Sequence, residues 1–378
     1  MSKIEELIKQ YCPNGVVYKE LGEIVDILDN QRKPVAKGKR NSGNIPYYGA
    51  NGIQDWVDNY IFDGTFLLVG EDGSVINKDN SPVLNWASGK IWVNNHAHIL
   101  AEKKNEANLR YVYFALSKTD VSSIVRGIPP KLNQQNLRSI AIPVPPLPVQ
   151  EEIVKILDAF TSLEAELEAE LEARKKQYEY YRNQLLSFDE NTTGGGRIKF
   201  MQLGDVCNIY TGGEAPSDSI KGNTSDETHI YPIYANGRDV YGYSSTYRID
   251  KDAVCISSIG ANTGAVFYYK KNFTPIIRLK VLTPKNDELN TKYLYYIAST
   301  INFVSKNGGG IPNMNANDVK KHIIPIPPLD EQERIVEILD KFDSLVNDIS
   351  EGLPAEIEAR KQQYEHYRNK LLTFDEAA

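Results

Sequence analysis

Two long stretches of the chain carry apolar and aromatic residues at spacings of three and four within a highly charged sequence. They cover residues 143–190 and 325–378. The mean spacing of about 3.5 residues is typical of a coiled-coil seam. Each stretch is predicted to form a helix of roughly 40 residues, about 60 Å long. Seam positions that we expect to pack between the helices or against a partner are Leu163, Leu167, Leu171, Tyr178, Tyr181, Leu345, Ile349, Tyr364 and Tyr367.

The second stretch is a copy of the first. Pro-Val-Pro-Pro-Leu (143–147) recurs as Pro-Ile-Pro-Pro-Leu (325–329), and Gln150 recurs as Gln332, each 182 residues later. Further along, Glu-Ala-Arg-Lys recurs after 186 residues, so the second copy holds four additional residues. They fall around Gly352 and Pro354, where we predict that the helix breaks. The first copy instead repeats a Glu-Ala-Glu-Leu module over residues 164–171.

The segments between the helices also repeat each other, but less closely. Ile-Pro-Tyr-Tyr-Gly-Ala-Asn-Gly (45–52) is echoed by Ile-Tyr-Pro-Ile-Tyr-Ala-Asn-Gly (230–237), and Gly-Ile-Pro (127–129) is echoed at 310–312. Short β-rich runs bounded by turn residues predict strands at 66–69, 90–93, 253–256 and 265–269. Helices are expected near 109–117 and 293–303, and Asn-Thr-Thr-Gly-Gly-Gly (191–196) is expected to be a flexible joint.

The predicted fold class is therefore α+β with a pseudo-twofold internal repeat. Two mixed α/β domains, at residues 1–142 and 191–324, alternate with spacer helices at residues 143–190 and 325–378. The short connections place the start of the second helix near the end of the first. The two helices are thus expected to run antiparallel, with the globular domains at opposite ends.

Composition restricts the possible function classes. Three cysteines in 378 residues argue against a disulfide framework and favour a reducing, cytoplasmic setting. The sequence has neither a run of about 18 apolar residues nor a signal peptide at its start. The net charge of −7 is unevenly distributed: residues 16–142 and 191–324 are mildly basic, at +2 and +4, whereas the two helical stretches are acidic. That distribution is compatible with two DNA-contacting domains joined by an acidic spacer.

Motifs for catalysis, cofactor binding and metal binding are missing. The sequence contains no phosphate-binding loop of the GxxxxGK type and no Asn-Pro-Pro-Tyr methyltransferase motif. His96 and His98 have strand spacing, but no cysteine or third histidine lies near them in the sequence, so we predict no metal site there. We therefore expect no catalytic residues, no metal and no cofactor in this chain.

The Pro-x-Pro-Pro-Leu-x-x-Gln motif before each long helix, and Arg-Lys-x-Gln-Tyr-Glu-x-Tyr-Arg-x-x-Leu-Leu near its end, resemble the specificity subunit of type I restriction–modification systems. The resemblance covers essentially the whole chain. It implies that each globular segment recognises one half of a split site in double-stranded DNA. It also implies that the helices set the gap and dock two methyltransferase subunits, alongside a restriction subunit. S-adenosylmethionine would then be bound by the methyltransferase.

Basic and amide side chains in the two globular segments are the candidates for DNA contact, because they bind phosphates and base edges. They are Arg32, Lys33, Lys37, Lys39, Arg40, Asn41, Arg126, Lys131, Arg238, Arg248, Lys270, Lys271 and Lys306. Two other hypotheses remain open at this point. One is a non-enzymatic scaffold whose two modules bind proteins without DNA specificity, and the other is an enzyme whose polar site the sequence does not reveal.

Overall fold

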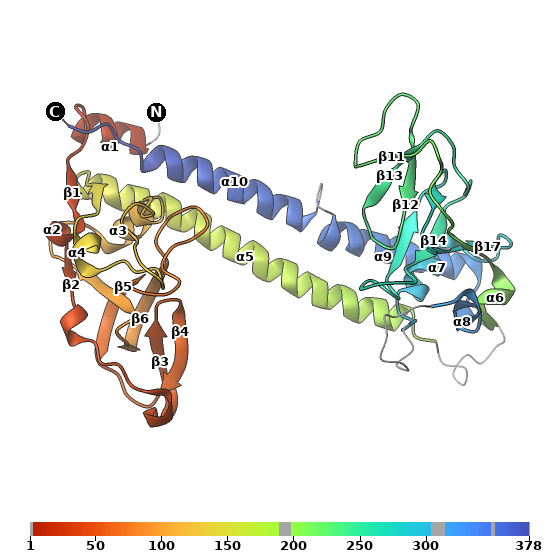
Figure 1. Cartoon of the computed structure of the whole chain (residues 1–378), viewed down its shortest axis with the longest axis horizontal. Coiled ribbons are helices and arrows are strands. Elements are labelled where there is room, and N and C mark those ends of the chain that lie inside the picture. The colour runs from red at the N-terminus through yellow and green to blue at the C-terminus, as the bar shows by residue number, and fades with distance from the viewer. Residues whose placement is uncertain (1–2, 189–197, 304–313, 349–351, 378) are drawn as a thin grey trace. The chain divides into compact units, whose positions relative to one another are not determined.

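The computed structural model describes residues 3–188, 198–303, 314–348 and 352–377 (Figure 1). The chain divides into two compact units. The first unit comprises residues 1–168 and 356–378, and the second comprises residues 169–355. Helix α5 (Leu147–Leu185) contributes its beginning to the first unit and its end to the second. Each unit thus combines one globular domain with parts of both copies of the helical repeat.

A six-stranded sheet forms the centre of the first unit, in the order β2-β7-β5-β6-β3-β4. Its strands are β2 (Val25–Ile27), β3 (Ser42–Gly49), β4 (Gly52–Val57), β5 (Phe62–Gly70), β6 (Leu84–Val93) and β7 (Ala97–Glu102). All neighbours are antiparallel except β3 and β6. Alternate residues of β5 point to opposite faces. Leu67 and Val69 join one hydrophobic core with the helices, while Phe66 and Leu68 join a second core.

Short elements surround that sheet. They are α1 (Lys3–Tyr11), the 3₁₀ turns η1 (Asp29–Gln31) and η2 (Lys37–Lys39), α2 (Leu21–Ile24), α3 (Leu109–Leu116) and α4 (Gln134–Arg138). Strands β1 (Tyr18–Glu20) and β8 (Ala141–Pro143) form an antiparallel pair just before α5. Asn108 caps α3 by accepting hydrogen bonds from the N–H groups of Arg110 and Tyr111.

The second unit contains two four-stranded sheets, in the orders β10-β17-β14-β15 and β11-β13-β12-β16. The strands are β10 (Cys207–Thr211), β11 (Ile220–Lys221), β12 (Tyr231–Tyr234), β13 (Val240–Ser244), β14 (Ala253–Ile256), β15 (Val266–Tyr269), β16 (Thr274–Pro275) and β17 (Lys280–Pro284). Also present are β9 (Lys199–Gln202), β18 (Ile323–Ile326), α6 (Leu203–Val206), α7 (Thr291–Ala298) and α8 (Ala316–Lys320).

The predicted internal duplication is visible strand by strand. Tyr18 pairs with Pro143 in the first unit, and Phe200 pairs with Pro325 in the second, which is the same pair 182 residues later. The four strands predicted from the sequence lie within β5, β6, β14 and β15, and the two short helices are α3 and α7. The joint predicted at 191–196 lies outside the described residues.

The long helices run antiparallel within each unit. Helix α9 (Leu329–Asn347) ends just before the predicted break and α10 (Leu353–Leu371) begins just after it, with Pro354 in its first turn. In the first unit, Phe160 lies beside Tyr364 while Glu168, further along α5, contacts Lys361, an earlier residue of α10. In the second unit, Tyr181 of α5 contacts Phe342. Within the described ranges, every helix is too short or too polar to span a bilayer.

Candidate nucleic-acid interface

Loops at one end of the sheet converge in the first unit. We define the first loop cluster as Asp29–Arg32, Glu71–Gly73, Asn94–Ala97 and Arg126–Leu132. Backbone hydrogen bonds hold these segments together, because Glu71 N–H donates to His96 O (2.8 Å) and Leu132 N–H donates to Glu71 O (2.8 Å). The cluster is the place where side chains from four separate loops share one surface.

Beneath the cluster lies a buried ion network. Arg32 Nη1 donates to Glu71 Oε2 (2.5 Å) and to Ala97 O (2.9 Å). His98 Nδ1 lies 2.6 Å from Asp29 Oδ2, and its Nε2 lies 2.7 Å from Leu132 O. Burial alone raises the pKa of Asp29, but the hydrogen bond and charge of His98 and the charge of Arg32 outweigh it and lower that pKa. The network therefore rigidifies the base of the cluster.

Asp29, Glu71 and His98 place their ligand atoms within 4.8 Å of one another, which is close enough to hold a metal ion. Their atoms are nevertheless already used. Both ring nitrogens of His98 contact protein oxygens, and Glu71 bonds Arg32 and Lys131 (3.0 Å). Internal hydrogen bonds thus account for the group without a metal.

The sequence-predicted DNA contacts of the first unit differ in how free their side chains are. Arg32 is committed to the buried network, and Lys131 Nζ contacts Glu71 from a half-exposed position. Arg126 is exposed on the hairpin that it closes with Lys131, and its Nη1 donates only to backbone oxygens, including Val125 O at 3.1 Å. The structure thus brings these three residues together.

The other candidates of the first unit lie on a separate segment around η2. Lys33, Lys37 and Lys39 are exposed, whereas Arg40 donates to Asp55 Oδ2 (3.0 Å) and its guanidinium carbon lies 4.0 Å from the centroid of a tyrosine ring. Asn41 donates to a neighbouring aspartate (3.1 Å). The three lysines therefore remain the cations of this segment that are open to a ligand.

An equivalent loop cluster exists in the second unit. We define the second loop cluster as Gly212–Glu214, Asn236, Ser257–Gly260 and Ile276–Leu279, with Met314. Met314 N–H donates to Ser258 O (2.9 Å), which matches the bond from Leu132 in the first unit. Asn236 Oδ1 accepts the N–H of Ser258 at 2.8 Å. The same end of the fold is therefore assembled in both units, from different side chains.

The basic candidates of the second unit are dispersed around this domain. Arg248 Nη1 donates to Glu214 O (3.0 Å), at the edge of the second cluster. Lys270 Nζ lies 3.6 Å from Asp252 Oδ2, and Lys271 is exposed next to it. Arg238 is also exposed, on the turn after β12. Lys306 lies outside the described residues.

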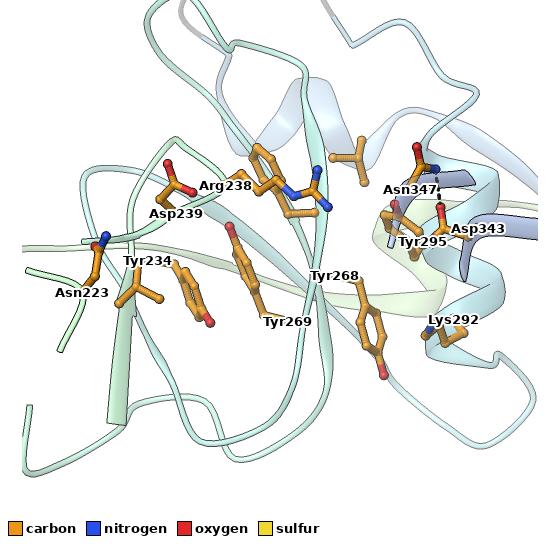
Figure 2. A pocket seen from close by; sticks show the side chains of 13 residues that line it. Asn223, Tyr234, Arg238, Asp239, Tyr268, Tyr269, Lys292, Tyr295, Asp343 and Asn347 are labelled. Carbon is orange, nitrogen blue, oxygen red and sulfur yellow. Dashed lines mark hydrogen bonds between the residues drawn. The ribbon is translucent and has the colours of Figure 1, made fainter. Parts of the chain in front are cut away.

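A cavity of about 740 Å³ opens between the β-domain of the second unit and α7 and α9. Figure 2 shows Arg238 and the parallel rings of Tyr234 and Tyr269, whose centroids are 3.6 Å apart. Lys292, which also lines the cavity, donates to Asp340 Oδ1 (2.8 Å). The cavity thus lies at the junction between domain and helix rather than in the loop cluster.

The same domain–helix junction is built in both units. Gln150 Oε1 accepts the N–H of Asn108 (2.9 Å), and Gln332 Oε1 accepts the N–H of Asn290 (2.8 Å). Both glutamines are buried, and each also donates to the carbonyl oxygen of a proline in its own Pro-Pro motif. Arg110 binds an aspartate of α5 as Lys292 binds one of α9. The repeated motif therefore fixes each domain to its helix.

An aromatic sandwich forms most of the predicted helix seam. Phe160 of α5 lies 6.4 Å and 5.4 Å, centroid to centroid, from Tyr364 and Tyr367 of α10. In the second unit, Phe342 occupies the same place, 6.4 Å and 5.6 Å from Tyr178 and Tyr181. These four tyrosines thus contact the partner helix of their own unit.

The aliphatic seam residues are placed less uniformly. Leu167 is buried, and Leu163 and Leu171 are half-buried. Leu345 is 38% exposed, whereas the adjacent Val346 is 1% exposed, so the buried face has shifted by one residue near the end of α9. A helical period of 3.6 departs from a 3.5 repeat in this way. Ile349 lies outside the described residues.

Sequence reasoning did not assign several residues of the two junctions and clusters. Tyr111 and Tyr293 are buried and donate to the carbonyl oxygens of Pro143 (2.8 Å) and Pro325 (2.9 Å). The equivalent repeat positions of these tyrosines could have revealed them. Arg278 of the second cluster had no comparable sequence signal, because its role depends on backbone conformation.

Comparison with known proteins gives one consistent family. The profile of the type I restriction modification DNA specificity domain matches residues 13–173 and again residues 197–359. A Haemophilus influenzae protein named as a putative type I restriction enzyme specificity subunit is 38% identical, over 95% of this chain and 96% of that protein. The Escherichia coli EcoR124I/EcoR124II specificity subunit is 36% identical over 71% of this chain and 72% of its own length.

The fold agrees with these matches. The crystal structure of a type I restriction–modification S subunit from M. genitalium superimposes with a TM-score of 0.67 at 16% sequence identity. The match covers 94% of this chain and 96% of that one.

Proposed function

The chain belongs to the DNA specificity subunits of type I restriction–modification systems, and on that premise we propose that each globular domain reads one half of a split, asymmetric DNA site. A specificity subunit recognises DNA sequence, is itself non-catalytic and acts together with the other subunits of its system. Such subunits are generally free of cofactors.

The observation that carries the split-site proposal is a contrast between the junctions and the loop clusters. The contacts that attach each domain to its helix are the same in both units, from Gln150 and Gln332 to the aromatic sandwiches. The loop clusters occupy equivalent places but carry different side chains. Two domains on a shared framework with unlike recognition surfaces are what two unlike half-sites require. A scaffold that only binds proteins is not favoured by the family matches.

We place the functional parts within the chain as two recognition domains, residues 1–142 and 191–324, and two spacer helices, residues 143–190 and 325–378. The exposed cations Lys33, Lys37, Lys39, Arg126 and Arg238 are the DNA contacts that this proposal favours, because their charges are not committed to carboxylates in the structure. Arg32 and Arg40, in contrast, would act indirectly by supporting the loops that they bind.

The partners follow from the same proposal. The acidic helices would dock two methyltransferase subunits, which would bind S-adenosylmethionine, and a restriction subunit would complete the assembly on double-stranded DNA in the cytoplasm. Tyr180, 57% exposed, and Tyr367, 42% exposed, offer aromatic contact area on these helices. Tyrosine is enriched at protein interfaces because its ring is large and its hydroxyl forms a hydrogen bond.

The test is co-expression of this chain with the methyltransferase subunit of its own system, followed by methylation sequencing of the host genome. We expect one methylated motif made of two unlike short half-sites separated by unspecified bases. A complex that forms but methylates without sequence preference would contradict the proposal and favour a protein scaffold. Omitting this chain from the same host is the control and should abolish the motif.

A further inference from the structure

The turn before β17 holds two consecutive residues in a left-handed backbone conformation. Ile277 has φ of 50° and Arg278 has φ of 61°. A β-branched residue with positive φ is a genuine outlier, because its Cβ approaches the backbone too closely. Such conformations persist where the surrounding structure imposes them, and they cluster at functional sites.

Four hydrogen bonds impose this conformation. The N–H groups of Ile277 and Arg278 donate to Gly213 O (2.8 Å) and Gly212 O (2.9 Å). Asn236 Nδ2 donates to Ile277 O (2.5 Å), and Ser258 Oγ donates to Arg278 O (2.6 Å). Glycine is required at 212, because a Cβ there would lie 2.9 Å from the backbone of the turn. The backbone of Arg278 is thereby fixed by three other segments of the second loop cluster.

The side chain of Arg278 is exposed while its backbone is held. Lys280, two residues later, is only 4% exposed, and its Nζ contacts Thr211 Oγ1 at 3.3 Å. Burial and the charge of Arg278 both lower the pKa of Lys280. Within the described parts of the chain, neither cation pairs with a carboxylate. The turn therefore presents positive charge that a ligand from outside the chain could balance.

The equivalent position in the first unit carries a different polar side chain. Leu100 and Leu282 pair with Ile27 and Ile209 at the same place in the two sheets, so the offset of 182 aligns Arg278 with His96. His96 O accepts a hydrogen bond from Glu71, as Arg278 O accepts one from Ser258. His96 is also exposed, with Nδ1 2.5 Å from Asp72 Oδ1. One framework position thus presents histidine in one domain and arginine in the other.

We propose that Arg278 is a specificity-determining residue of the second domain, which reads the edge of a guanine in the major groove. The inference rests on the proposed function and adds the residue and the base. The guanidinium can donate two hydrogen bonds to O6 and N7 of guanine, the commonest specific contact of arginine with DNA. A rigid backbone suits base reading, since the side chain must reach a single register. A change of side chain at the equivalent position of the other domain fits the recognition of a different half-site.

The experiment compares Arg278→Ala and Arg278→Lys with wild-type chain, each co-expressed with the methyltransferase subunit and followed by methylation sequencing. Purified complexes are then titrated with the wild-type site and with its single-base variants. Lys251→Ala is the matched control, because it removes an exposed cation at the opposite end of β14 from Ser258.

We expect both Arg278 variants to relax one G·C position in one half-site and to leave the other half-site unchanged. Discrimination at that position should fall by about 5- to 150-fold, the worth of a bidentate contact. Arg278→Lys should bind the wild-type site better than Arg278→Ala, because it keeps the charge but loses the fork. Lys251→Ala should leave the motif unchanged.

Uniform weakening on all sequences, with a strict motif and a smaller salt dependence, would overturn the inference in favour of a phosphate contact. An unchanged motif and affinity would also overturn it. Thermal melting and co-purification check folding, and if Arg278→Ala does not fold, Arg278→Lys decides. If wild-type chain itself gives no sequence-dependent methylation, the proposed function fails as well, which is a separate result from a strict motif in the variants.

Discussion

Deletion of one helical module tests whether α5 sets the distance between the two half-sites. The change removes Glu164–Leu167 from the doubled Glu-Ala-Glu-Leu segment. At about 1.5 Å and 100° per residue, the helix shortens by about 6 Å and its later part rotates by about 40°. With about 3.4 Å per base pair, the gap between half-sites should shrink by about one to two base pairs.

The contacts of the first unit predict that this deletion is tolerated. Lys361 of α10 lies 3.4 Å from Glu164 and 3.0 Å from Glu168 of α5. After the deletion, Glu168 and Glu172 take over these two positions, and Leu171 takes the place of Leu167. Phe160 precedes the deleted segment and keeps its stack on the tyrosines of α10. The register should therefore shift by one module without the loss of a seam contact.

Methylation sequencing of the co-expressed deletion variant measures the gap directly. Both half-sites should remain unchanged in sequence while the number of unspecified bases between them falls. A motif with its original gap would refute the idea that α5 acts as a ruler. Glu166→Ala, which alters the module but preserves its length, should leave the gap unchanged.

Three further outcomes are expected from stability measurements on the full chain. Gln332→Ala should destabilise the second unit by about 2–4 kcal/mol, because it leaves Asn290 N–H and two buried carbonyl groups unpaired; urea unfolding checks this, and a loss no larger than that of the exposed Gln184→Ala would contradict it. The lowered pKa of Asp29 stabilises the fold above the ordinary carboxyl pKa of 3.8, and this contribution is lost as pH falls through the lower folded value. Asp29→Asn should thus be less stable near neutral pH yet lose less stability between pH 6 and pH 3 than wild-type chain, and parallel pH profiles in thermal melts would speak against it. Phe160→Ala should cost about 2 kcal/mol through the lost stacking and apolar burial, and an unchanged unfolding midpoint would disprove the sandwich's role.

The sequence predicts those features of this fold that depend on local periodicity. The seam spacing around Phe160 and Phe342 identified the helices, and the additional residues around Gly352 and Pro354 identified the break between α9 and α10. Both signals are local, because apolar spacing and proline act within a few residues. Leu345 deviates because the buried face of a helix drifts against a 3.5-residue repeat, an effect that accumulates with length.

Side-chain partners, in contrast, are set by loops that are distant in the sequence. Arg32 and Lys37 are both basic residues of one loop region, yet Arg32 is held by Glu71, 39 residues away, while Lys37 is exposed. Composition cannot separate these two cases. Gln150 was visible as part of a repeated motif, but its bond to Asn108, 42 residues away, gives the motif its structural role.

The two kinds of information together explain how one chain can change its DNA target while keeping its partners. The junction around Gln150 and Gln332 and the tyrosines of the helices are duplicated, so each domain is attached to its helix in the same way. Positions such as His96 and Arg278 lie in loops whose backbone is fixed by hydrogen bonds from neighbouring segments. A substitution there alters what is presented to DNA without altering the framework. Specificity should thus change through the loop clusters alone, and the gap between half-sites through the helices alone.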